Sequence, residues 1–434
     1  VKGSSESNAD VGDRANDSLR VDGVDLRCRI VGEGGNLGLT QLARAEYAIS
    51  GGLIYTDAID NSAGVDCSDH EVNIKIVLDQ LVRDGELTVK QRNELLVEMT
   101  DEVARLVLDD NRAQTLALMI ARTQSLSMVN VHARYLDTLE AEGHLDRELE
   151  FLPSDKQIAE RQSAGSGLRA PEFAVMIAYT KNASVSELLE SDLPDELAVE
   201  PDLLEYFPVE LRERFPDSIR SHRLRREIVA TSVINNMVNL AGISFDHRMT
   251  EDSGASVSDV ARAFLASREI FGFADIWREI DTLGSSVSLD TQISLFLDAR
   301  RMAERGTVWL LRHRRPPLDI LEAVDAFSAG LAFLSESLDQ VVSDRVATEL
   351  ERVGRDRMGA GVPVGLAERS ARWLWLHTGF DIVEIAHTEA RNVADAATAY
   401  WATFDAFDLG WLWDGVGNLP RSDRWQEQAR SAIR

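Results

Sequence analysis

Two short segments near the start of the chain combine glycines with asparagines in a pattern that suits a small ligand. The first segment is GEGGNLGLT, at residues 32–40, and the second is DNSAGVDCS, at residues 60–68. Glycine lets a ligand approach the backbone, and an asparagine amide offers both a donor and an acceptor. Asn36 and Asn61 therefore suit the carboxamide of a nicotinamide ring or the head group of an amino acid.

The first segment differs from the common dinucleotide-binding fingerprint. That fingerprint, G-x-G-x-x-G, opens a helix at the first turn of a βαβ unit and is followed by an acidic residue about 20 positions later. After Gly34 the next suitable glycine is Gly38, which is the wrong spacing. A purely structural turn also uses glycine and asparagine, so the residue types alone leave a ligand site and a plain turn both open.

Both segments are predicted to lead from a strand into a helix. Residues 25–31 and 53–60 have strand character, and residues 40–50 between them carry an apolar stripe at helical spacing. Ligands of parallel α/β sheets bind outside the carboxyl ends of the strands. We therefore expect Asn36 and Asn61 to face the same crevice.

The remainder of the chain is predicted to be a loop followed by many helices. Residues 1–24 lack apolar periodicity and are expected to form a mobile loop, and Thr40 is a plausible N-cap of the helix after it. Beyond Ser68 the apolar period is 3.6 residues throughout. The first three long helices are expected to begin at Ser68 or Asp69, to span residues 88–109, and to run from 112 past 135. Residues beyond about 136 are expected to fold autonomously.

The composition excludes several classes of protein. The 434 residues include 46 basic and 73 acidic side chains, a net charge of −27 that repels phosphate backbones. The basic run at residues 311–317 is expected to end a helix, so no nucleic-acid partner is predicted. The apolar runs are too short for a membrane span. Only Cys28 and Cys67 occur, which is typical of a reducing compartment and predicts a cytoplasmic location.

Two other clusters receive structural interpretations. Residues 66–71, DCSDHE, resemble a metal site, but no second histidine follows at metal spacing and Cys67 has no cysteine partner, so acidic capping of a helix is favoured and no metal is predicted. Large aromatic side chains crowd the last third of the chain and are expected to pack in a core or subunit interface. These are Trp373, Trp375, Trp401, Trp411, Trp413 and Trp425.

At the glycine–asparagine segments the sequence resembles the amino-acid dehydrogenases, and glutamate dehydrogenases in particular. Their nucleotide-binding domain ends with E-G-A-N-x-x-x-T, a helix, a strand and N-A-G-G-V-x-x-S. The residues that match are Glu33, Gly34, Asn36 and Thr40 in the first motif and Asn61, Gly64, Val65 and Ser68 in the second. Segments such as VGDRAND and GLRAPEFAV extend the resemblance, over nearly the whole chain, to the C-terminal portion of large multidomain bacterial NAD-dependent enzymes.

The resemblance implies a fold and a site. The fold would be predominantly α-helical, with an N-terminal remnant of an α/β Rossmann-type nucleotide-binding domain and its trailing helices in residues 1–135 and an all-helical domain in residues 136–434. Ser68 would bind the side-chain carboxylate of L-glutamate. The cofactor NAD would contact Gly34, Gly35, Asn36 and Asn61.

The resemblance also implies an incomplete enzyme. The reaction would be the reversible oxidative deamination of L-glutamate to 2-oxoglutarate and ammonia, within a homo-oligomer. The family places its catalytic lysines near K-G-G and its dinucleotide fingerprint upstream, and the five lysines here lie in no such motif. We therefore expect the catalytic residues to precede this chain, and the chain alone to be inactive.

Two alternatives remain from the sequence. The chain as given would serve as a non-catalytic helical assembly or regulatory module, which is compatible with a role in organising the oligomer of a longer enzyme. A dehydrogenase of the leucine or phenylalanine type is disfavoured by Ser68, because those relatives carry an apolar residue at that position.

Overall fold

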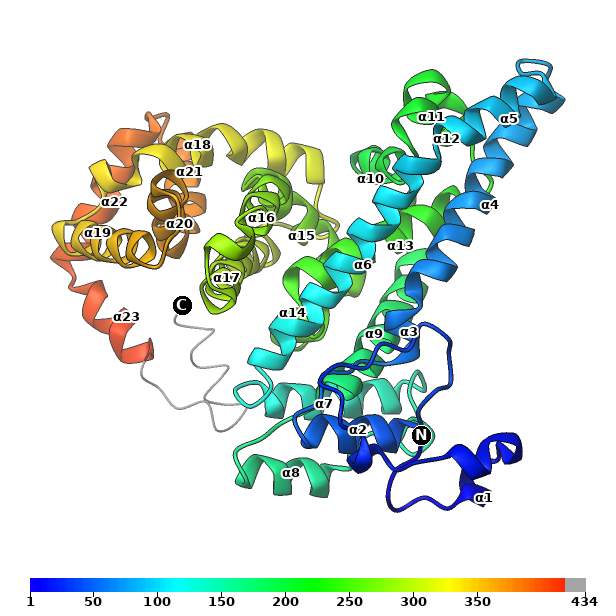
Figure 1. Cartoon of the computed structure of the whole chain (residues 1–434). Helices are drawn as coiled ribbons and strands as arrows, with labels where there is room; N and C mark the ends of the chain where they lie inside the picture. The colour runs from blue at the N-terminus through cyan, green and yellow to red at the C-terminus, as the bar shows by residue number, and fades with distance from the viewer. Residues whose placement is uncertain (418–434) are drawn as a thin grey trace. The chain divides into compact units, whose positions relative to one another are not determined.

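The chain is built almost entirely of helices, as predicted. The computed structural model describes residues 1–417 (Figure 1). The Cα positions fall into two compact units, Val1–Asp246 and His247–Arg434. These compact units do not test the domain boundary that the sequence predicts near residue 135, and that boundary stays a prediction.

The predicted strands do not form in the described residues. The two expected strands meet at one isolated parallel bridge, between Ile30 and Leu53, in which the Val31 N–H donates to the Leu53 carbonyl at 3.0 Å. The rest of segment 25–31 forms no ladder, and the helix α3 (Asp57–Asp60) replaces the end of the second expected strand. Strand character without a neighbouring strand leaves the backbone groups unpaired, so a ladder cannot grow.

The first unit begins with short elements joined by polar contacts. Residues 1–24, expected to be a loop, contain α1 (Asn8–Val11), the 3₁₀ turn η1 (Arg14–Leu19) and a second bridge between Lys2 and Asp22. The predicted helix after them is confirmed as α2 (Gln41–Ile49). Its N-cap is Thr40, whose hydroxyl accepts from the Ala43 N–H at 3.2 Å.

Long helices build the core of the first unit. The helices α6, α9 and α13 pack against one another, α4 packs against α6, and α2 packs against α9. Phe173 and Met237 are completely buried among them. The bounds are α4 (Ser62–Arg83), α5 (Val89–Glu98), α6 (Thr100–Thr123), α7 (Val129–Ala141), α8 (Asp155–Ser163), α9 (Ala170–Glu190), α10 (Glu200–Glu205), α11 (Val209–Arg214), α12 (Pro216–Arg220) and α13 (Arg225–Ala241).

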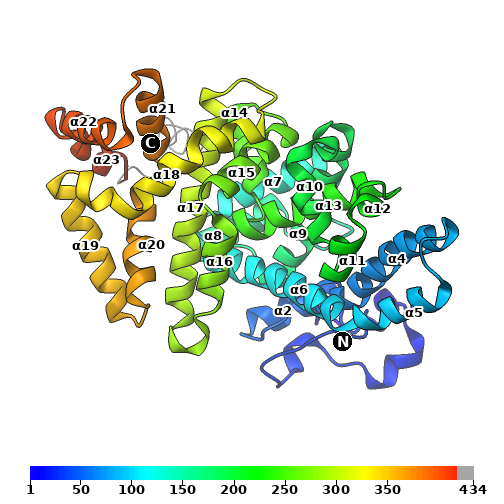
Figure 2. The same ribbon diagram turned by 90° about the horizontal axis from the view of Figure 1, so that it is seen from above.

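Three helix boundaries differ from the sequence prediction. The helix α4 begins at Ser62, so Ser68 and Asp69 lie inside it and do not cap it. The helix expected over residues 88–109 is divided at Met99, which is 2% exposed and lies between α5 and α6. The helix expected from residue 112 past 135 is the end of α6 and then α7. Figures 1 and 2 both show α4 and α5 side by side.

The second unit is also helical. Its core joins α15, α17, α18 and α20. The bounds are α15 (Val257–Ile270), α16 (Phe273–Asp281), α17 (Leu289–His313), α18 (Ile320–Val341), α19 (Asp344–Gly359), α20 (Val364–Leu376), α21 (Gly379–Thr388), α22 (Val393–Ala406) and α23 (Leu409–Gly417), and α14 (Phe245–Ser253) spans the boundary between the units. The basic run does end a helix, because α17 stops at His313.

The tryptophan prediction is confirmed in part. Trp373, Trp375 and Trp401 are buried, and Trp401 packs against Trp375 with ring centroids 5.6 Å apart. Trp411 is 70% exposed and does not belong to that core. The side chain of Trp413 and all of Trp425 lie outside the described residues.

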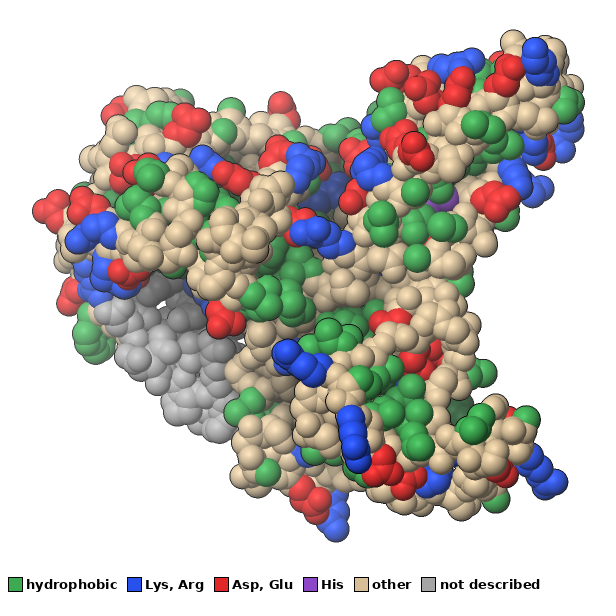
Figure 3. Space-filling model, viewed as in Figure 1, with side chains coloured by type: hydrophobic (Ala, Val, Ile, Leu, Met, Phe, Trp, Pro, Cys, Tyr) green, Lys and Arg blue, Asp and Glu red, His purple; other side chains and the backbone are tan. Residues whose placement is uncertain are grey.

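The surface carries both signs of charge. On the face drawn in Figure 3, acidic and basic side chains are interspersed over the end of the α4–α5 pair. Among the described helices, none by itself has the length and apolar character to cross a membrane.

Candidate functional site

The glycine-rich segment at residues 32–40 folds around one buried carboxylate. Glu33 is 5% exposed and accepts two hydrogen bonds from the guanidinium of Arg44 on α2, at 2.6 and 3.0 Å. The same carboxylate accepts from the Leu39 N–H at 3.0 Å. A buried carboxylate needs such charged and backbone donors, and these donors fix the path of the loop.

Two further carboxylates hold the loop from the other side. Asp60 accepts from the Glu33 N–H at 2.9 Å, and Asp57 accepts from the Leu37 N–H at 2.8 Å. Arg44 also reaches Asp57, at 3.1 Å. Burial alone would raise the pKa of Asp57, but the Leu37 N–H and the Arg44 charge outweigh it and hold the pKa below its usual value.

The two predicted asparagines meet. The side-chain amide of Asn61 donates to the side-chain oxygen of Asn36 at 2.8 Å, although they come from different loops. Asn36 and Leu37 adopt left-handed backbone angles, with φ of 48° and 55°, which asparagine tolerates better than leucine does. The structure therefore brings together the residues that the sequence placed in one crevice.

Gly34 and Gly35 border open space. A Cβ atom added at either position would have no heavy atom within 4 Å, and neither glycine has a positive φ. Nothing in residues 1–417 requires glycine at these two positions. Bare backbone next to exposed amides fits the close approach of a planar ligand such as a nicotinamide.

Ser68 lies near the same site but not where the sequence placed it. It is exposed, in the second turn of α4, and its hydroxyl donates to the Gly64 carbonyl at 3.3 Å. Residues 61, 64 and 68 share one face of the helix, and seven residues span about 10 Å along its axis. Asn61 and Ser68 are therefore separated by about two helical turns on the same side of α4.

The lysines of the chain are engaged elsewhere. Each one has a carboxylate or amide partner other than Asn36, Asn61 and Ser68. The pairs are Lys2 with Asp22, Lys75 with Glu71, Lys90 with Glu94, Lys156 with Glu160 and Lys181 with Gln114. None of them is placed to polarise a carbonyl at the asparagine pair.

Sequence reasoning missed Arg44 and Asp57 as parts of the site. Arg44 lies within the predicted helix but outside its apolar stripe, and Asp57 lies in an expected strand. Nothing in their spacing indicates that both reach Glu33 or its loop. The only signal was Glu33 itself, an acidic residue inside a glycine-rich turn, which calls for a basic partner when it is buried.

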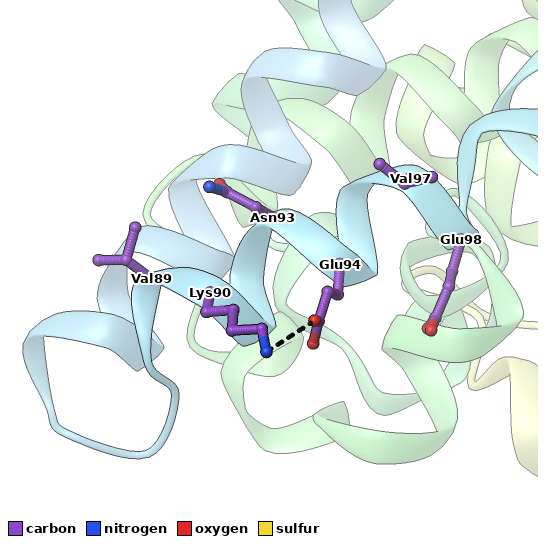
Figure 4. Close-up of a pocket in the computed structure, with 6 residues that line it drawn as sticks. All are labelled: Val89, Lys90, Asn93, Glu94, Val97 and Glu98. Carbon is purple, nitrogen blue, oxygen red and sulfur yellow. Dashed lines mark ion pairs between the residues drawn. The ribbon is translucent and has the colours of Figure 1, made fainter.

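A hollow on α5 is a weaker candidate for a ligand-binding site than the asparagine pair. It is lined by Val89, Lys90, Asn93, Glu94, Val97 and Glu98, all from α5 (Figure 4). Figure 4 shows the Lys90–Glu94 ion pair along one edge, at 3.8 Å. A hollow lined by a single helix offers few converging polar groups, whereas binding sites have several.

Comparison with known proteins assigns the chain to a family. Residues 165–434, more than half of the chain, match the family model "Glutamate dehydrogenase, C-terminal", and residues 1–121 match "Bacterial NAD-glutamate dehydrogenase, catalytic domain". The chain therefore belongs to the bacterial NAD-glutamate dehydrogenase family. The asparagine pair, the glycine loop and Ser68 all fall in the part that matches the catalytic domain.

The relatives are much longer proteins. The chain is 44% identical over its whole length to an NAD-specific glutamate dehydrogenase of Pseudomonas aeruginosa and 43% identical to one of Mycobacterium tuberculosis. A third, from Halomonas elongata, is 41% identical. In each case the chain spans 27% of the length of the relative.

Proposed function

We propose that this chain is part of an NAD-dependent glutamate dehydrogenase, an oxidoreductase that converts L-glutamate reversibly to 2-oxoglutarate and ammonia. The observation that carries the proposal is the hydrogen bond between Asn36 and Asn61, which joins two loops of the family's catalytic domain at one exposed point. When bound, NAD accepts a hydride from the substrate. The residues of this chain would orient that cofactor and one end of the substrate.

Each part of the site has its own role in this proposal. Gly34 and Gly35 leave the backbone open to the nicotinamide and ribose side of NAD, and the amides of Asn36 and Asn61 hydrogen-bond to it. The Ser68 hydroxyl donates to the side-chain carboxylate of glutamate, a hydrogen bond to a charged acceptor. The groups that polarise the carbonyl and transfer protons are expected upstream of this chain.

The loops around the site would be the last part of a Rossmann-type domain. The parallel pairing of Ile30 with Leu53, on either side of α2, supports this, because a strand, a helix and a parallel strand are the repeating unit of that fold. The remaining strands would come from the longer protein.

The location and the assembly belong to the same proposal. Both cysteines carry free thiols, which a reducing cytoplasm preserves. Phe407 and Trp411, four residues apart in the sequence, are 73% and 70% exposed, and large exposed aromatic side chains support a subunit contact. If the chain is instead a purely non-catalytic assembly module, Phe407 and Trp411 would serve the same subunit contact. Sedimentation of the full-length enzyme would show whether it is a homo-oligomer.

The asparagine pair gives the test of cofactor binding. In the full-length enzyme, Asn61→Ala removes one amide from the pair, and we expect the KM for NAD to rise roughly tenfold because a buried ligand hydrogen bond contributes about 1–1.5 kcal/mol. Asn93→Ala, an exposed asparagine on α5, is the matched control. An Asn61→Ala enzyme whose NAD kinetics equal those of the control would contradict the proposal. The 434-residue chain alone is expected to show no turnover.

A further inference from the structure

A cluster of ligand-type side chains lies on the other face of α4, away from Ser68. It consists of Asp66 and His70, four residues apart on α4, and Asp110 on α6. One oxygen or nitrogen atom from each lies within 4.8 Å of the others, and the His70 Nε2 is 3.8 Å from an Asp66 oxygen. The i, i+4 pair with a third residue from a packed neighbouring helix is the usual construction of ion sites between helices.

The histidine of this cluster has no hydrogen-bond partner. His70 is only 2% exposed, yet neither of its ring nitrogens is satisfied, and one Asp66 oxygen is also buried without a partner. Buried polar atoms normally have partners, so such orphans point to a missing ion or water. Tyr206 stacks on the His70 ring, with centroids 4.4 Å apart, and thereby fixes the plane of the imidazole.

The nearest cation does not neutralise the two carboxylates. Lys181 on α9 donates to the Gln114 side chain at 2.9 Å, and within the described residues no ion pair joins it to Asp66 or Asp110. The two carboxylates carry one more negative charge than Lys181 balances.

The sequence favours helix capping and no metal at residues 66–71, but α4 begins at Ser62, so Asp66 and His70 lie inside the helix. We propose instead that Asp66, His70 and Asp110 bind a divalent transition-metal ion of the Zn²⁺ type. One imidazole nitrogen and two carboxylates form a donor set that such ions accept, with water in the remaining position. Ligand atoms around a tetrahedral Zn²⁺ lie about 3.4 Å apart, so the distances between the ligand atoms shorten on binding by about 0.4 Å for the Asp66–His70 pair and by no more than about 1.4 Å for any pair. Asp110 is exposed, which gives the ion a path from solvent.

The ion would tie α4 to α6. The helix α4 also carries Asn61 and Ser68 on its opposite face, so the metal holds the helix that presents these residues. The role is structural and independent of the dehydrogenase reaction, so loss of the metal site would leave the proposed function standing.

Metal binding to the 434-residue chain tests the proposal directly. The two exposed cysteines would bind Zn²⁺ themselves, so the experiment uses the Cys28→Ser/Cys67→Ser background. After treatment with a chelator, calorimetric titration with Zn²⁺, and separately with Mn²⁺, should show one tight Zn²⁺ site per chain and a higher melting temperature with the ion bound. Absence of a stoichiometric Zn²⁺ site in this protein would overturn the proposal, whatever the ligand variants do.

Matched variants assign the site to its ligands. His70→Gln and Asp110→Asn should each weaken Zn²⁺ binding at least about tenfold, since each removes a direct ligand. Asp109→Asn changes the neighbouring carboxylate, which pairs with Arg105 at 2.7 Å, and should bind as the parent does. Equal binding by the Asp109→Asn and Asp110→Asn proteins, both folded by circular dichroism, would refute the assignment.

Lys181 provides a second discriminating variant. If the metal is the resident cation, Lys181→Met removes a competing charge and should raise Zn²⁺ affinity several-fold. If the ammonium group itself occupies the cluster, the variant should lose stability and gain no affinity for Zn²⁺, and this result would contradict the proposal.

Discussion

The first 61 residues and the second unit are held together by different forces. The former have few regular elements, and their loops are fixed by charged side chains such as Glu33 and Arg44. The second unit is held by aromatic packing, in which Phe380 is completely buried against Trp309 and Phe327 at centroid distances of 5.1 and 5.0 Å.

The first region is built to present backbone and amide groups to a ligand, whereas the second is built for stability. Carboxylates that accept from loop N–H groups hold the backbone while Gly34, Gly35 and Asn36 stay exposed to a ligand. An apolar core would cover the same groups. The described residues of the second unit present no backbone of this kind to a ligand, and the stability of that unit comes from the burial of apolar side chains. All eight tryptophans lie between residues 277 and 425, so tryptophan emission reports on the second unit alone.

The strongest test of this comparison removes the first unit. We expect residues 247–434 to give a helical circular-dichroism spectrum and a cooperative melt, because their helices pack on one another. The sequence alone predicts that residues beyond about 136 fold autonomously. The packing predicts instead that a chain starting at Gly143 aggregates, since it keeps α9 and α13 and loses α6, which covers their apolar faces. If the 143–434 fragment folds cooperatively and the 247–434 fragment does not fold, the boundary between the two independently stable parts does not lie near residue 246.

A smaller effect is expected from Glu33→Gln. The substitution keeps the shape of the side chain but removes the charge that Arg44 pairs with, and hydrogen bonds to charged groups contribute about 1.5–3 kcal/mol. The lost stability should appear as faster hydrogen exchange in residues 33–42. The thermal melt of the second unit, followed by tryptophan emission, should not change. Glu94→Gln, in an exposed pair with Lys90, is the control and should change neither signal. A shift in the tryptophan melt would show that the two regions are coupled.

The local parts of the fold were predictable, and the long-range parts were not. Thr40 and α2 follow from the residues within one helical turn of each other. The division at Met99 carries no glycine or proline, so the sequence offered no break. The start of α4 was misplaced because Asn61, Ser68 and Asp69 are about equally good caps by residue type, so type alone does not select among them. The structure has Asn61 at the N-cap position, with its side chain bonded to Asn36 instead of to the helix.

The site shows the same division. Topology alone brought Asn36 and Asn61 to one edge, and the structure gives their hydrogen bond. The contact of Arg44 with both Glu33 and Asp57 joins residues 11 and 13 positions away, and no local pattern encodes it. Long-range ion pairs depend on how elements pack, which propensity does not determine.

The acid dependence of the loop should be smaller still. The pKa of Asp57 lies below its unfolded value of about 3.9, so its contribution to stability is complete above that pH and is lost as the pH falls through the folded value. Protection of residues 33–42 against hydrogen exchange, corrected for intrinsic rates, should hold at about pH 5 and fall below about pH 4. Asp57→Asn should already exchange fast at pH 5. A variant loop as protected as the parent there would contradict this assignment.

Glutamate kinetics of Ser68→Ala in the full-length enzyme test the central claim most directly. Alanine favours a helix interior, so stability should not fall. We expect kcat/KM for glutamate to drop about tenfold to a hundredfold, or roughly 1.5–3 kcal/mol, with the KM for NAD unchanged. Ser186→Ala is the matched control, because Ser186 is also exposed within a helix and donates to a carbonyl four residues back, at 2.9 Å. Glutamate kinetics of Ser68→Ala equal to those of Ser186→Ala would contradict the account.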